Sequence, residues 1–124
     1  MGILGGGGRR ERDEMELRAE LARLDALPLD DLADEVLRRV FGPDGRARDG
    51  VVPAEEAVVP FDPRGTGLFP GMPKDIREGH RELVEEGVQR LEQRGLVLVR
   101  VTGRDQTKVA LRLTRAGRRA LGAA

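Results

Sequence analysis

Apolar and polar residues follow the period of a helix in the first third of the chain. Residues 9–26 carry leucines at every third or fourth position, and residues 30–41 carry a broader apolar face that starts among acids and ends among arginines. Both spacings match one face of a helix, and the placement of the charges suits the helix dipole. Pro28 stops the first segment, and Asp30 is the expected cap of the second. We therefore predict two helices, the second of which ends at Gly42.

A third helix is predicted over residues 73–94. Pro73 stands at the first helical position, which proline favours, and Gly95 follows the last turn. The apolar side of this helix is formed by Ile76, His80, Leu83, Val84, Gly87, Val88 and Leu91. We expect that side to be buried, and we expect His80 to be a core residue rather than a catalytic or metal-binding one.

The pattern changes to the two-residue period of β-structure after Gly95. Residues 96–101 are rich in valine and leucine, and residues 108–113 alternate between apolar and polar side chains. A polar turn joins these two segments, and Thr114 can cap a closing helix over residues 115–121. The sequence thus predicts an α+β chain that is mostly helical and carries a C-terminal β-hairpin.

Two stretches lack such a period. Residues 1–8 contain four consecutive glycines, which predict a flexible tail because ordering glycine costs much backbone entropy. Residues 42–72 hold five of the seven prolines and repeated glycines. We interpret them as a Pro/Gly-rich arm with short extended pieces at Val51–Val52 and Val58–Val59, docked in part through its apolar side chains. Residues 9–124 then form a single domain of ordinary size.

The composition removes several kinds of chemistry. There is no cysteine, and His80 is the only histidine, so disulfides, thiolate metal sites and the common nucleophile-and-base sets are excluded. The only aromatic residues are three phenylalanines, too few for stacking platforms that hold bases. We predict no enzymatic activity, no cofactor and no metal site. Because no apolar run approaches the roughly 20 residues that span a bilayer, we expect a cytoplasmic protein without a membrane partner.

Charge is balanced overall but unevenly distributed. Residues 1–73 hold ten basic and fifteen acidic side chains, whereas residues 74–124 hold twelve basic and seven acidic ones. The first half therefore carries five net negative charges and the second half five net positive charges. A basic half is typical of a nucleic-acid face, but opposite charges can equally attract the two halves to each other.

Two short motifs flank the predicted hairpin. They are LEQRGLV at residues 91–97 and LRLTRAGRRAL at residues 111–121. Their order and separation resemble the LexxGLV and LTxxGxxxL segments of winged helix-turn-helix regulators of the MarR and PadR type. The resemblance covers about residues 73–121. It implies a winged-helix domain whose wing is the hairpin, a role in transcriptional regulation, double-stranded DNA as partner, and a homodimer formed through terminal helices.

The resemblance also implies which side chains meet DNA. In such proteins the helix before the wing enters the major groove, and the wing contacts the backbone or the minor groove. The corresponding basic residues are Lys74, Arg77, Arg81, Arg100, Arg104, Lys108 and Arg112. A continuous positive stripe from this helix to the wing would favour DNA, whereas acids that interrupt the stripe would favour a protein partner.

Two departures from the family pattern keep a second interpretation open. The best candidate for a positioning helix, residues 30–41, is separated from Pro73 by the whole arm. The 73–94 helix also carries several acids, which oppose contact with phosphates. The alternative is a winged-helix protein-interaction module without DNA binding, whose partner is held through residues 51–70 of the arm. We interpret the arginines of the closing helix as a solvated face.

Overall fold

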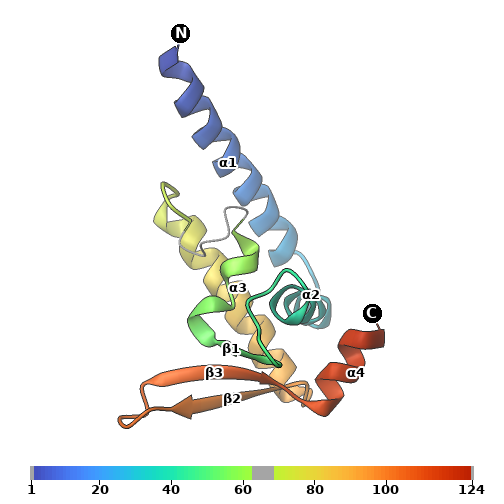
Figure 1. Cartoon of the computed structure of the whole chain (residues 1–124). Coiled ribbons are helices and arrows are strands. Elements are labelled where there is room, and N and C mark those ends of the chain that lie inside the picture. Colours follow the sequence, from blue (N-terminus) through green and yellow to red (C-terminus); the bar gives the residue numbers. More distant parts are fainter. Residues whose placement is uncertain (1, 63–68, 124) are drawn as a thin grey trace.

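The computed structural model describes residues 2–62 and 69–123 (Figure 1). Met1, residues 63–68 and Ala124 lie outside the described residues, and the predicted docking of Leu68 lies there too. The elements are α1 (Gly2–Asp25), α2 (Leu29–Phe41), β1 (Val51–Pro53), the 3-10 turns η1 (Ala54–Glu56) and η2 (Val59–Phe61), α3 (Lys74–Gln93), β2 (Val97–Thr102), β3 (Lys108–Leu113) and α4 (Arg115–Ala123). The chain is α+β and mostly helical, as predicted.

Helix α3 is the centre of the molecule. α1 and α2 pack against it, and the hairpin of β2 and β3 leaves from its C-terminal end (Figure 1). The seven residues predicted to form its apolar side are all buried, including His80. This confirms the predicted burial, and α3 begins and ends within one residue of the predicted limits.

The leucine stripe of α1 packs inside the chain. Leu17 and Leu24 are almost fully buried, and Leu21 lies directly against Gly79 of α3. These leucines are therefore used within one protomer and are not free to pair with a second copy.

α1 starts earlier than the sequence predicted. The backbone of residues 2–8 is helical, whereas the glycines predicted a flexible tail. Extending an existing helix adds one hydrogen bond for each residue that is fixed, while only the first turn carries the cost of nucleation. The packed turns around Leu17 supply that nucleus for the residues before them.

The sheet has three antiparallel strands in the order β1-β3-β2. β2 and β3 form the predicted hairpin, with Val97 opposite Leu113 and Thr102 opposite Lys108. β1, which comes from the arm, adds to the free edge of β3 and places Val52 opposite Leu111. The arm therefore contributes one strand to the sheet that carries the hairpin.

Much of the arm packs into the core. Val51–Val52 is extended, as predicted. The prediction that Val58–Val59 is extended is wrong. Val58 has helical dihedral angles, and η2 starts at Val59. The proline that follows Val59 fixes φ near −65°, which suits a tight turn. Val58, Phe61 and Phe69 are buried. Three of the apolar side chains expected to hold a partner through residues 51–70 are thus largely covered by the chain itself.

Ion pairs join the acidic first half of the chain to the basic second half. Asp30 of α2 bonds to Arg90 of α3 at 2.7 Å, and Asp34 bonds to Arg94, which directly follows α3, at 3.0 Å. The prediction that Asp30 caps α2 is wrong, because the helix already begins at Leu29. Part of the charge asymmetry is therefore neutralised within the molecule.

A second cluster of charges links α1 to α2. Glu20 and Glu35 both accept hydrogen bonds from Arg23 and Arg39, at distances from 2.5 to 3.1 Å. The hydrogen bond from Arg23, aided by the positive charges of both arginines, lowers the pKa of each carboxyl below its ordinary value of 4.5. These carboxylates therefore stabilise the fold in their ionised form.

Acid is expected to lower the contribution of this α1–α2 charge cluster to the free energy of unfolding. A lowered pKa in the folded state contributes stability that is complete above the ordinary value and is lost as the pH falls through the lowered one. Urea unfolding at about pH 6 and about pH 3 will measure the loss. Glu35→Gln should be less stable than the wild type at the higher pH and should lose less on acidification, whereas Glu16→Gln, exposed on α1, should behave like the wild type. Equal losses for Glu35→Gln and the wild type would contradict this account.

Candidate nucleic-acid interface

Gly95 and Thr114 fix the hairpin and α4 to the end of α3. Gly95 has a φ of +74°, the left-handed conformation that lets the chain reverse after the helix, and the N–H of Leu96 donates to the carbonyl of Leu91 at 2.9 Å. The Thr114 hydroxyl donates to the carbonyl of Gly95 at 2.7 Å and accepts from the N–H of Gly117 at 3.0 Å. One side chain therefore caps α4, as predicted, and ties it to the start of β2.

Strand alternation gives the hairpin two different faces. The inner face, toward α3, is apolar and contains Val97, Val99, Val101, Val109, Leu111 and Leu113. The outer face contains Leu98, Arg100, Thr102, Lys108, Ala110 and Arg112. Burial fades along the inner face, because Val97 is fully buried while Val101 is 54% exposed. The hairpin thus projects beyond the core toward its turn.

Cations dominate the charge of the outer face. Arg100, Lys108 and Arg112 are all exposed. Their direct cross-strand neighbours are uncharged, namely Ala110, Thr102, Leu98 and Val51. Within residues 2–62 and 69–123, none of these three cations forms an ion pair. Arg104 is also exposed, in the hairpin turn.

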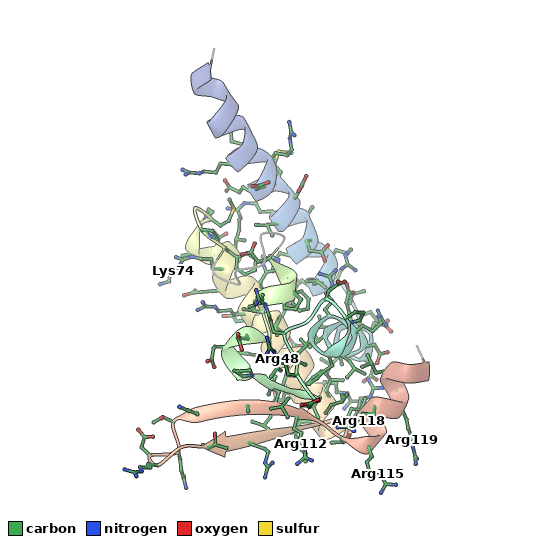
Figure 2. All side chains as sticks on the ribbon, in the orientation of Figure 1. Arg48, Lys74, Arg112, Arg115, Arg118 and Arg119 are labelled. Atoms are coloured by element: carbon green, nitrogen blue, oxygen red, sulfur yellow. The ribbon has the colours of Figure 1, made fainter. Side chains whose placement is uncertain are left out.

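The cations predicted on α3 do not share this face. Lys74, Arg77 and Arg81 are exposed, but α3 packs against the inner side of the hairpin. Lys74 pairs with Glu78 at 3.6 Å and lies at the end of α3 that is remote from the hairpin (Figure 2). The structure therefore does not bring the α3 cations and the outer-face cations of the predicted site together on one surface.

A groove of about 520 Å³ lies between α3 and the hairpin. Its apolar lining includes Val58, Val84, Val88, Val99, Val109 and Leu111. Three acids, Glu55, Glu85 and Glu92, line it together with Arg81. Acids therefore interrupt the positive stripe that would join α3 to the hairpin.

The region before α3 also differs from a simple helix-turn-helix. Between α2 and Pro73, the described residues form β1, η1 and η2 and no α-helix. α2 packs beside α3 as a core helix instead. The separation noted in the sequence is thus a real interruption, filled by a strand and two short turns.

α4 continues the cations of the outer face. Arg115, Arg118 and Arg119 are exposed and lie three and four residues apart, which places them on one side of the helix. Figure 2 shows all three at the same end of the molecule as Arg112. Sequence reasoning treated them as a solvated face and left them out of the candidate site.

The missed signal was the local shortage of acids. From Val97 to Ala123 the chain holds seven basic side chains and one acidic side chain, Asp105. The hydroxyl of Thr107 donates to Asp105 at 2.8 Å, and this bond lowers the pKa of the carboxyl. The hairpin and α4 therefore carry six net positive charges, although the whole chain is neutral.

His80 is a core residue, as predicted. It is fully buried, its ring centroid lies 4.9 Å from that of Phe69, and its Nδ1 lies 2.9 Å from the carbonyl of Ile76. Because a carbonyl oxygen only accepts, Nδ1 is the protonated nitrogen, and Nε2 has no partner in the described structure. The parts of the chain described contain no group of three or more His, Cys, Asp or Glu residues arranged to hold a metal ion.

Comparison with known proteins assigns no family. The chain has no significant match among protein-family models, curated proteins or solved structures. Among the described residues, no helix combines the length and the apolar character needed to cross a bilayer. The likeness of residues 73–121 to winged-helix regulators remains a prediction from their motifs, and function has to be inferred from the surface.

Proposed function

We propose that this chain is a winged-helix protein that binds double-stranded DNA and acts as a transcriptional regulator. The observation that carries the proposal is the cationic outer face of the hairpin, where Arg100, Lys108 and Arg112 form no ion pair among the described residues. Support for the architecture comes from the order of the elements: a helix ending at a glycine turn, a β-hairpin and a threonine-capped closing helix. This is the order that the two motifs imply.

The electrostatics of the outer face suit a duplex. Cations that neutralise phosphates release bound counterions, and this release drives binding. Successive outward residues on a strand are about 7 Å apart, so Lys108 and Arg112 span about 14 Å, a distance over which one DNA strand presents about four phosphates. A cation without a carboxylate partner can meet a phosphate without first breaking an ion pair.

Fluorescence anisotropy with short labelled genomic duplexes tests the proposal. Lys108→Glu should weaken binding about tenfold at about 50 mM salt, because it removes one phosphate contact. Arg12→Glu makes the same change of charge on α1, where the arginine is exposed and remote in sequence from the hairpin, and should leave affinity unchanged. Wild-type binding that is absent, or that does not weaken between about 50 and 200 mM salt, would remove the proposal.

A homodimer belongs to the same proposal, since the resemblance implies one. Leu17 and Leu24 are occupied within the protomer, so the dimer would use other surfaces than the leucine stripe. Sedimentation equilibrium at several protein concentrations distinguishes the two states, and a monomer throughout would set the dimer aside without affecting DNA binding.

A protein-interaction module is the second candidate function, and the groove between α3 and the hairpin favours it. Its apolar lining and three acids suit an amphipathic segment that carries basic side chains. Val99→Glu should then abolish capture of a specific partner while leaving duplex affinity intact. Partners captured equally by the wild type and the variant would count against the groove.

A further inference from the structure

We infer that the duplex backbone is held mainly at α4, by Arg112 together with Arg115, Arg118 and Arg119. These four residues are called the α4 arginine cluster below. The inference rests on the proposed function, because it names the surface through which the duplex is bound. It also extends the phosphate contact beyond the wing, to which the family resemblance assigns the contact with the DNA backbone.

The backbone that carries the cluster is held rigidly. The N–H of Thr114 donates to the carbonyl of Leu96 at 3.0 Å, and the hydroxyl of Thr114 caps α4. Arg118 lies over the turn that leads into β1. Its guanidinium is 3.4 Å from the point that a Cβ would occupy if residue 50 were not a glycine. Groups fixed before binding lose less entropy when a ligand arrives, which suits a backbone-binding surface.

The cluster differs from the arginines that join the helices, because none of its members has a carboxylate partner among the described residues. Arginines that join the helices each bond to at least one carboxylate, as for Arg18, Arg23, Arg39, Arg90 and Arg94. Across the ranges that the structure describes, no ion pair involves a member of the cluster. The strand neighbours of Arg112 are the apolar Val51 and Leu98. Four guanidinium groups therefore lie at one end of the molecule, and none of them is in an ion pair within the described parts of the chain.

The chemistry of this surface points to phosphates on a nucleic acid. Guanidinium groups bind phosphate oxygens through two parallel hydrogen bonds. α3 is a poorer candidate, because residues 74–93 hold four basic and six acidic side chains. A lipid surface is disfavoured, because Ala120 and Leu121 pack against the core of the protein and are not available to enter a bilayer.

The test compares two double variants of the full chain with equal changes of charge. Arg115→Gln with Arg118→Gln removes two members of the cluster, and Arg10→Gln with Arg12→Gln removes two exposed arginines of α1. Anisotropy titrations with a labelled duplex over a range of salt give affinity and salt slope. The cluster variant should lose roughly a hundredfold in affinity at about 50 mM salt and about two units of slope, while the control should match the wild type. Circular dichroism and urea unfolding check that both variants fold.

The outcomes separate the inference from the proposed function. If Lys108→Glu weakens duplex binding but the cluster variant does not, the inference is wrong and the proposed function stands. If both double variants lose equal affinity, the effect comes from net charge and the inference is again wrong. If the wild type binds anionic phosphatidylglycerol vesicles as tightly as the duplex, and the cluster variant loses both, the surface is a membrane site and the inference is overturned.

Discussion

Phe69→Ala is expected to lower the free energy of unfolding by about 3 kcal/mol. The ring is fully buried and packs on that of His80, and removing a buried phenylalanine costs about 3 to 5 kcal/mol. We expect the lower end of this range because the polar ring of His80 borders the cavity that the substitution would leave, and water that enters a polar cavity offsets part of the loss.

The measurement is urea unfolding of the variant beside Met15→Ala. Met15 is 72% exposed on α1, so its truncation should change stability by less than about 0.5 kcal/mol. A loss below about 1 kcal/mol for Phe69→Ala would show that this part of the arm is not docked. The N–H of Phe69, which donates to Asp62 at 3.1 Å, is unaffected by the substitution, so the experiment isolates the ring.

The sequence predicts α3 and the hairpin well because their signals are local. The burial of α3 follows from its own apolar spacing, and the ends of both strands lie within one residue of the predicted limits. Gly95 and Thr114 also act as expected, since turns and caps depend on neighbouring residues. Local periodicity was therefore enough to define this half of the fold.

The arm could not be predicted in the same way because its structure depends on distant partners. Val52 is held by Leu111, which is far along the chain, and Phe69 is held by His80 and Asp62. No period within residues 42–72 encodes these contacts. The same reason explains the pairing of Asp30 with Arg90, since an acid at a helix start suits a cap and an ion pair equally well.

The candidate site was predicted only in part. Alternation along β3 placed Lys108 and Arg112 on the outer face, and both are exposed there. The same alternation turns them away from α3, so they do not share a surface with Arg77 and Arg81. The two-residue period of β3 already separated these groups, whereas the roles that the resemblance gives to the α3 cations stay predictions.

Gly117→Ala is expected to give the second large loss in the free energy of unfolding, and it tests how closely α4 packs against the start of β2. A Cβ at this position would lie 2.2 Å from the carbonyl oxygen of Leu96 and 2.7 Å from a methyl of Leu113. That carbonyl cannot move freely, because it accepts the N–H of Thr114. Overpacking of this kind costs about 3 kcal/mol, and the better helix propensity of alanine returns about 1 kcal/mol. We therefore expect a net loss of about 2 kcal/mol, measured by urea unfolding.

Gly122→Ala provides the matched control, because nothing lies within 4 Å of a Cβ at that position of the same helix. It should be neutral or stabilising by up to about 1 kcal/mol. Gly117→Ala keeps every arginine but displaces α4 from Thr114, so duplex affinity should fall while net charge is unchanged. Stability lost without any fall in affinity would mean that the position of α4 is irrelevant to binding. Because the two glycine variants share one chemical change, a difference between them reports the seating of α4 alone.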